Sequence, residues 1–371
     1  MDSYLVKPRI YMDRDGLTEI LQGRKKAFIV TDRFMHESGK VSYITDICAR
    51  MGVEVTIFSE IKPDPDIATV TKGISMMVDI KPDVLFALGG GSSIDAAKAM
   101  NYLASREGML EKAYFVAIPT TSGTGSEVTT FAVISDPDKK AKYPLISENM
   151  LPDAAVLDVR MTETLPPRMT ASTGMDALCH AIEAYTCLQK NPVSDAYASA
   201  AVHMVGMYLE QAVKNGTDEE ARLGMANAST MAGAAFSNSM VGMVHAIGHA
   251  LGGICHVPHA DAMTVLLPYC MEYNMEALGN LYGELLLHFA GAEAYAEIAQ
   301  EDRGTAMVQE VRNLAARLHD RCGLPVSLKE TSADPGLFEQ VAAAALNDGA
   351  MLVNPVQVGK ADVLEILRRA Y

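Results

Sequence analysis

The chain has 371 residues, a length that favours two hydrophobic cores rather than one. Hydrophobic residues make up 49% and charged residues 21%, and no apolar run approaches the roughly 18 residues of a membrane span. The formal net charge of -15 argues against nucleic acid as a partner, because phosphates bind basic surfaces. The six cysteines form no CxxC pair, and residues 1–30 show no export signal. We expect a soluble, cytoplasmic protein that acts on small molecules or protein partners.

Short β-rich runs alternate with polar helical stretches in the first part of the chain. The predicted strands are residues 26–31, 53–58, 83–88, 115–118 and 131–134. Alternating strands and helices are typical of βαβ units around a parallel sheet. The tetrapeptide DPDK at 136–139 predicts a turn. The pattern predicts an α/β domain with a parallel sheet over residues 1–164.

From about Leu165 the segments become long, rich in Ala, Met and Leu, and helical in period, as in residues 176–185, 199–213 and 361–370. The boundary is expected at Leu165-Pro166-Pro167, because proline disfavours helix in the residue before it and starts helices well. We therefore predict an all-α domain over residues 165–371.

A glycine-led loop, Gly89 to Lys98, follows the predicted strand 83–88 and runs into an alanine-rich stretch. Glycines at the start of a helix let a pyrophosphate approach the backbone, and the helix dipole favours the anion. The loop matches neither G-x-G-x-x-G nor a P-loop. A plain turn, with Ser92 and Asp95 as a capping-box-like pair, is the alternative interpretation.

Two further features are candidates for nucleotide contacts. The loop 119–127 combines several hydroxyls with two glycines after a strand, and its side chains can hydrogen-bond ribose or phosphate. Asp32 follows the first predicted strand, where an acid can accept from a ribose hydroxyl. Loops of this composition are also ordinary connections, and Asp32 can equally cap the next helix.

Histidines and a carboxylate cluster in two segments of the helical part. Asp176 and His180 are four residues apart, as are His245 and His249, and this spacing puts each pair on one helical face. His256 and His259 follow a glycine break. One carboxylate with several imidazoles is typical of a catalytic divalent-metal site.

Two classes of hydrolase fit the sequence less well. The spacing of His245 and His249 resembles the zinc-hydrolase helix H-E-x-x-H, but Ala246 stands where the glutamate would activate water. No G-x-S-x-G elbow is present, so the sequence does not support a serine hydrolase.

Together these motifs closely resemble the iron-containing, or group III, alcohol dehydrogenases. The resemblance runs from Asp32 to about Asn274 and rests on stretches whose order and spacing are specific to that family. They are GGGSSIDAAKA, PTTSGTGSEVTT, ISDPDKKAKYP, ASTGMDALCHAIEAY and HAIGHALGGICHVPHA. The stretch FSEIKPDPDI is most similar to the 1-propanol dehydrogenase branch of propanediol utilisation.

The resemblance implies a dehydroquinate synthase-like fold. In this fold a Rossmann-like, dinucleotide-binding domain (1–164) and a helical, metal-binding and substrate domain (165–371) flank a cleft. The positions that match the family's metal ligands are Asp176, His180, His245 and His259. Proximity in sequence alone would favour His249 as the fourth ligand, whereas the resemblance places it near nicotinamide and substrate, as a candidate proton relay. The family favours Fe²⁺, and the ligand set also permits Zn²⁺.

The resemblance also assigns the cofactor and substrate contacts. The matching cofactor positions are Asp32, Gly90, Gly91, Ser92, Asp95, Thr120, Thr121, Ser122, Thr124 and Lys142. Asp95 joins His249 among the candidate catalytic residues. Asp32 predicts NAD rather than NADP, because a carboxylate there repels a 2′-phosphate. Phe131 and Phe236 match the substrate side and imply a narrow apolar pocket.

The expected activity is hydride transfer between NAD and a small primary alcohol or aldehyde, with a metal that polarises the oxygen. Family likeness implies a homodimer or larger assembly and suggests association with a bacterial microcompartment. A glycerol dehydrogenase or a dehydroquinate-synthase-like lyase is the rival on the same architecture, although the complete Asp and three-His set favours the alcohol dehydrogenases. A non-catalytic scaffold is the other alternative.

Overall fold

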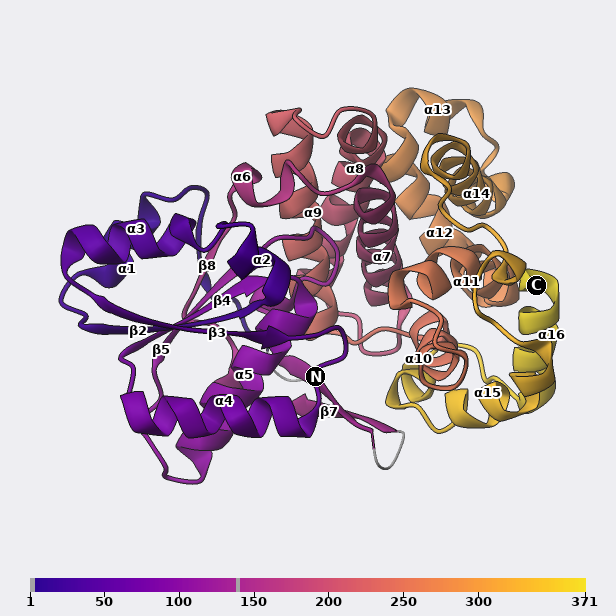
Figure 1. Ribbon diagram of the computed structural model, residues 1–371. Helices are drawn as coiled ribbons and strands as arrows, with labels where there is room; N and C mark the ends of the chain where they lie inside the picture. The colour runs from indigo at the N-terminus through magenta and orange to yellow at the C-terminus, as the bar shows by residue number, and fades with distance from the viewer. Residues whose placement is uncertain (1–3, 138–140) are drawn as a thin grey trace. The chain divides into compact units, whose positions relative to one another are not determined.

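The computed structural model describes residues 4–137 and 141–371, and Figure 1 shows its elements. The chain divides into two compact units. One covers Val6–Thr162, and the other joins the chain up to Leu5 with Glu163–Tyr371. The assignment of nucleotide binding to the first unit and metal binding to the second stays a prediction.

A six-stranded sheet forms the centre of the first unit. Its strands are β1 (Arg9–Tyr11), β2 (Lys26–Asp32), β3 (Glu54–Ile61), β4 (Val84–Gly89), β5 (Tyr114–Pro119) and β8 (Ala154–Val156). They pair in the order β1-β8-β5-β4-β2-β3, and every pairing is parallel. All of β4 is buried, as expected of a parallel strand covered on both faces. The predicted parallel sheet is therefore present.

Helices cover both faces of this sheet. The helices α1 (Gly16–Leu21) and α3 (Ser42–Met51) lie on one face, and α4 (Ile67–Ile80) and α5 (Gly91–Arg106) lie on the other (Figure 1). The alternation of side chains along each strand separates two hydrophobic cores. In β2, for example, Ala27 and Ile29 join the core with α1 and α3, whereas Phe28 and Val30 join the core with α4 and α5.

The remaining elements of the first unit are short. They are α2 (Arg33–Glu37), α6 (Val159–Thr162), the 3-10 turns η1 (Ser126–Val128) and η2 (Glu148–Met150), and the strands β6 (Phe131–Asp136) and β7 (Ala141–Ile146). The two strands form an antiparallel hairpin. The predicted DPDK turn begins at Asp136, the last residue of β6, and residues 138 and 139 lie outside the described residues.

The second unit is helical from Pro167 onward, as predicted. Its helices are α7 (Pro167–Thr186), α8 (Pro192–Lys214), α9 (Glu219–Ser237), α10 (Met243–Cys255), α11 (His259–Tyr273), α12 (Met275–Ala290), α13 (Ala292–Glu297), α14 (Arg303–Cys322), α15 (Phe338–Ala345) and α16 (Lys360–Ala370). Four 3-10 turns lie between the later helices among the described residues: η3 (Gln300–Asp302), η4 (Leu328–Glu330), η5 (Pro335–Leu337) and η6 (Gly349–Val353). None of the described helices is long and apolar enough to cross a membrane.

Local sequence signals explain where these helices begin. Pro167 occupies the first turn of α7, where a missing N–H costs nothing. The Asn191 side chain accepts from two N–H groups at the start of α8 and forms a reciprocal capping box with Ser194. Helix α7 is buried on nearly all sides, so polar residues on it must find partners inside the protein.

Candidate functional site

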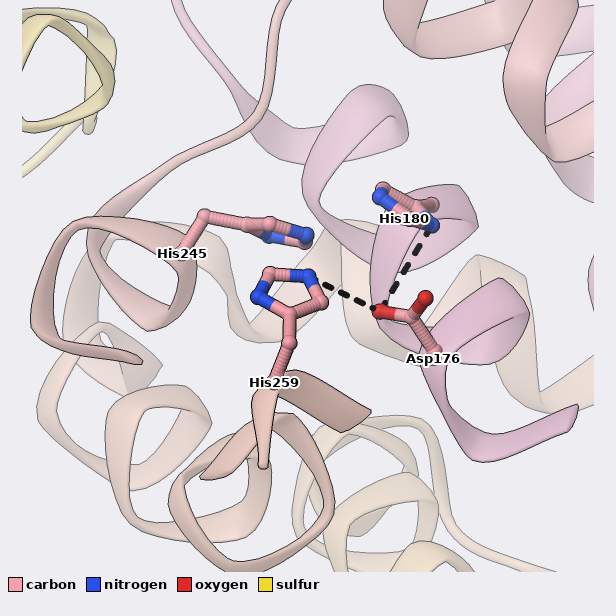
Figure 2. A group of neighbouring side chains, drawn as sticks. All are labelled: Asp176, His180, His245 and His259. Carbon is pink, nitrogen blue, oxygen red and sulfur yellow. Dashed lines mark ion pairs between the residues drawn. The ribbon is translucent and has the colours of Figure 1, made fainter. Parts of the chain in front are cut away.

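Four side chains from three helices converge inside the second unit (Figure 2). Asp176 and His180 lie one turn apart on α7, His245 lies in the first turn of α10, and His259 is the first residue of α11. One potential ligand atom of each lies within 4.8 Å of the others. Asp176, His180 and His245 are buried, whereas 40% of the His259 side chain is exposed. The group therefore has closed walls and one accessible side.

Three polar atoms in this group lack hydrogen bonds. Asp176 Oδ1, His180 Nδ1 and His245 Nε2 are buried without a hydrogen-bond partner among the described residues. Asp176 Oδ1 lies 3.8 Å from His180 Nδ1 and 3.4 Å from His259 Nε2, distances too long for good hydrogen bonds. Buried polar atoms without partners are costly, and several that converge fit a bound cation. The donor set of carboxylate and imidazole suits a divalent transition metal.

The protonation states agree with this fit. Burial lowers the pKa of His180 to about 3, and burial also lowers the pKa of His245 well below its ordinary value. Both rings are therefore neutral at pH 7, the form that binds metals. Burial alone would raise the pKa of Asp176, but the neighbouring imidazoles of His180 and His259 outweigh it and lower that pKa. Asp176 therefore contributes an anionic oxygen.

A buried glutamate holds His245 in one orientation. The Oε2 atom of Glu183 accepts a hydrogen bond from His245 Nδ1, and Oε1 accepts one from the Val244 N–H at 2.7 Å. A Cβ on Gly242 would lie 2.9 Å from Oε1, so this position needs glycine. With its proton on Nδ1, the His245 ring presents the Nε2 lone pair to the converging group. This is the usual support of a metal-binding histidine, and no local pattern in the sequence marks Glu183 for it.

A second group that could hold a metal, Cys179, Glu183 and His245, lies next to the first. Its chemistry is less suitable, because His245 Nδ1 already donates to Glu183. Burial also raises the pKa of the Cys179 thiol well above its ordinary value, so the thiolate that binds metals is disfavoured.

The other candidate residues of this region lie around the group rather than in it. The ring of Phe236 stacks on His180, with centroids 4.4 Å apart. His249 lies one turn after His245 but is not part of the four-residue group. His256 takes the left-handed conformation (φ 57°) that ends α10, and this break lets α11 begin at His259.

In the first unit, the predicted glycine loop joins β4 to α5. Gly89 has φ 154°, and a Cβ there would lie 2.5 Å from Ser93 Oγ. Gly90, not Ser92, is the N-cap of α5, and glycine has no side chain that could cap the helix start. The capping box that we considered for Ser92 and Asp95 is therefore wrong. An uncapped helix start beside glycines leaves N–H groups for an anion.

Side chains from two neighbouring loops border the glycines. A Cβ on Gly90 would lie 3.3 Å from Thr121 Oγ1, and one on Gly91 would lie 2.9 Å from the Thr124 methyl group. A Cβ on Gly89 would lie 3.6 Å from Asp32 Oδ2. The other carboxylate oxygen of Asp32 accepts from the Met35 N–H and caps α2, so the cap interpretation of Asp32 is confirmed. Its second oxygen still faces the glycine loop.

Asp95 and the buried Lys98, both on α5, form hydrogen bonds with the segment 126–133. Asp95 accepts from Ser126 Oγ at 2.6 Å and from the Val133 N–H at 2.9 Å. The ammonium of Lys98 donates to Ser126 Oγ, Thr129 Oγ1 and the Phe131 carbonyl. Burial lowers the pKa of Lys98 to about 8. These contacts give Asp95 a structural task, and the predicted cofactor and catalytic roles of Asp95 stay predictions.

The other predicted contacts of the first unit are placed as follows. Thr120 and Ser122 are buried in the loop after β5, Ser92 lies in the first turn of α5, and Phe131 begins β6. The backbone of Lys142 lies in β7, but its side chain is outside the described part of the structure.

Comparisons with known proteins agree with this architecture. A model of iron-containing alcohol dehydrogenase matches residues 8–159, and a model of the C-terminal part of the Fe-containing alcohol dehydrogenase family matches residues 170–371. Among solved structures, a 1,3-propanediol oxidoreductase superposes with a TM-score of 0.93 at 32% identity, covering 100% of both chains.

Three relatives are similar over nearly their whole length. The 1-propanol dehydrogenase of Salmonella typhimurium is 38% identical, covering 99% of each chain. The NAD-dependent methanol dehydrogenase of Bacillus methanolicus is 34% identical, covering 100% of each chain. The NADPH-dependent butanol dehydrogenase of Clostridium saccharobutylicum is 34% identical, covering 98% of this chain and 96% of the relative.

Replacing Glu183 with Gln should weaken divalent-ion binding about 10- to 100-fold. The glutamine oxygen can still accept from Val244, but its amide would donate to His245 Nδ1 and move the ring proton to Nε2. Titration of the metal-free protein with Zn²⁺ against a chromophoric chelator measures the affinity.

The matched control is Glu284→Gln, which changes a surface glutamate that accepts from the Tyr185 hydroxyl at 2.7 Å. This variant should bind Zn²⁺ as the unmodified chain does. Equal affinities for both variants would remove Glu183 from the metal site.

Proposed function

Because the chain belongs to the iron-containing alcohol dehydrogenase family, we propose that it passes a hydride between NAD and a small primary alcohol or its aldehyde, at a divalent ion bound by Asp176, His180, His245 and His259. The observation that carries this proposal is the convergence of these side chains, three of which offer buried polar atoms without a hydrogen bond among the described residues. A structural scaffold would have no need for such atoms, because they destabilise the fold unless a cation fills the site.

The metal is proposed to be Fe²⁺, with Zn²⁺ as the substitute that the ligands also accept. Iron is supported by the family to which the chain belongs. Three imidazoles and one carboxylate bind both metals, and affinity at such a site rises from iron to zinc. Availability in the cell therefore decides between them.

Each bound group supplies one part of the chemistry. A divalent ion at this site supplies a Lewis acid that lowers the pKa of an alcohol or polarises an aldehyde. A nicotinamide supplies the acceptor or donor of the hydride. The chain itself holds the ion and the nicotinamide at the positions that hydride transfer needs, and it keeps bulk water away from them.

The residues of the metal centre divide this task. Burial of Asp176, His180 and His245 fixes the ligand atoms before any ion binds, and Glu183 keeps His245 Nε2 free of a proton. The partly exposed His259 borders the accessible side of the group. Phe236, stacked on His180, presents an apolar surface next to the ligands and supports a small, unbranched substrate.

The proposed substrates are propanal and 1-propanol, or homologues of two to four carbons. Support comes from the full-length similarity to a 1-propanol dehydrogenase and from relatives that are named for methanol and butanol. A homodimer or larger assembly and association with a bacterial microcompartment are also proposed, as the family resemblance implies. All six cysteines are free thiols, which agrees with a reducing cytoplasm.

NAD is proposed over NADP because of Asp32. Its Oδ2 lies beside the glycine loop, where a carboxylate repels a 2′-phosphate and accepts from a free ribose hydroxyl. One relative is named for NAD and another for NADPH, so the family leaves the choice to such local contacts.

Removing divalent ions should abolish the oxidation of NADH by aldehydes of two to four carbons, and Fe²⁺ or Zn²⁺ should restore it. His259→Ala should lower kcat about a thousandfold, equivalent to roughly 4 kcal/mol of lost stabilisation of the transition state. Absorbance of NADH in a stopped assay measures both effects.

His256→Asn is the control for that experiment, because His256 lies three residues before His259 but outside the metal group, and Asn tolerates its left-handed backbone. It should retain full activity. Full turnover by the metal-stripped protein would refute the proposed mechanism.

Asp32→Asn should raise the preference for NADPH over NADH at least about tenfold, because it removes roughly 1.4 kcal/mol or more of charge repulsion. Asn keeps the oxygen that caps α2, so the helix start survives. Values of kcat/KM with the two cofactors measure the preference.

Asp66→Asn makes the same change at the cap of α4, where Asp66 accepts from the Thr69 N–H at 2.7 Å. This control should leave the cofactor preference unchanged. An unchanged preference in Asp32→Asn as well would show that another residue selects the cofactor.

A further inference from the structure

A second carboxylate–imidazole pair lies one helical turn beyond the first. His249 follows His245 by four residues on α10, and its Nδ1 lies 2.9 Å from Asp348 Oδ2. Asp348 comes from the turn after α15, and its other oxygen accepts from the Ala350 N–H at 2.8 Å. Both oxygens of this carboxylate are therefore fixed by protein donors. Asp348 lies outside the metal group and is not among the residues that the family resemblance assigns.

The His249 ring lies against two of the candidate metal ligands. It stacks on His259, with centroids 5.5 Å apart and planes 19° apart, and it meets His245 edge-on at 5.8 Å. Of its side chain, 43% is exposed, so part of the ring is accessible to solvent. With Nδ1 held by Asp348, Nε2 is the nitrogen that stays available.

We propose that Asp348 is a positioning residue for proton transfer: it keeps a proton on His249 Nδ1 and fixes the ring, so that Nε2 takes the hydroxyl proton of the alcohol. This inference rests on the proposed dehydrogenase function. In the oxidation, the hydride carries two electrons from the alcohol carbon to NAD, the O–H bond breaks, and the hydroxyl proton passes to Nε2. Asp348 then faces an imidazolium, and the reverse reaction returns the proton from Nε2 to the nascent alcohol.

The charge of Asp348 suits this task. Burial alone would raise its pKa, but the hydrogen bonds from His249 and from the Ala350 N–H lower the pKa below its ordinary value. The carboxylate is thus ionised and can stabilise positive charge on the ring. The Glu183–His245 pair is buried, and its histidine is one of the candidate metal ligands. The Asp348–His249 pair has the same carboxylate–imidazole contact, but its histidine ring is partly exposed. The two pairs therefore support different tasks.

A purely structural role for Asp348 is the alternative. The carboxylate caps η6 through Ala350, and a cap alone would explain one of its two contacts. The chain offers a close match for that role at Asp334, which caps η5 through the Gly336 N–H, also at 2.8 Å. Changes at the two caps can therefore be compared directly.

The experiment compares Asp348→Asn, Asp348→Ala and Asp334→Asn in the metal-loaded chain. Asn at 348 keeps the cap and the contact with His249, but its amide donates to Nδ1 and forces the ring proton to Nε2. We expect kcat for alcohol oxidation to fall about 100-fold in Asp348→Asn, with KM within about twofold and metal content unchanged. In Asp348→Ala, kcat should fall by about tenfold or more. In Asp334→Asn, kcat should equal that of the unmodified chain.

A readout independent of turnover follows the proton itself. In the Zn²⁺-loaded chain with ¹⁵N-labelled histidine, the His249 signals are identified by their loss in His249→Gln. The unmodified chain should show the proton on Nδ1, and Asp348→Asn should show it on Nε2.

Two results would overturn the inference. One is a proton on Nε2 in the unmodified chain, and the other is an unchanged kcat in Asp348→Asn. An unmodified chain without dehydrogenase activity would instead refute the proposed function, while the ¹⁵N signals would still report on the Asp348–His249 pair.

Discussion

The proposed metal site depends on the buried carboxylate of Asp176 and on the two neutral imidazoles beside it, those of His180 and His245. Asp176 Oδ1, His180 Nδ1 and His245 Nε2 are buried without a hydrogen-bond partner among the described residues, and polar atoms in that state are costly. A divalent ion bound there would offset this cost, and only the folded chain brings its ligands together. The one-turn spacing on α7, the break at His256 and the support from Glu183 all fit that proposed site.

Local sequence signals predicted much of this arrangement. Four-residue spacings put Asp176 and His180 on one helical face, and the glycines after an apolar run predicted the loop between β4 and α5. The main parallel strands followed from their apolar runs. The sequence does not predict the strands β1 and β8. Three residues are too few to show the alternation of a strand, and the pairing of both strands depends on distant segments.

Residues that act through distant contacts were harder to find. Glu183 lies within the recognised motif, but its partner is 62 positions away, and Asp348 lies 99 positions from His249. The residues next to Glu183 and Asp348 in sequence form no pattern that predicts a distant histidine as the hydrogen-bond partner. Lys98 shows the same limit: its sequence context is an ordinary helix, and only the fold brings Ser126, Thr129 and Phe131 around its ammonium. Tertiary geometry decides these roles.

The most direct test of this account is anomalous X-ray diffraction from crystals of the chain grown with Fe²⁺ or Zn²⁺. The account predicts one strong anomalous peak within bonding distance, about 2.0–2.2 Å, of Asp176, His180, His245 and His259. A chain that binds the ion elsewhere, or that fills this space with water or a hydrogen-bonded side chain and no metal, would contradict it.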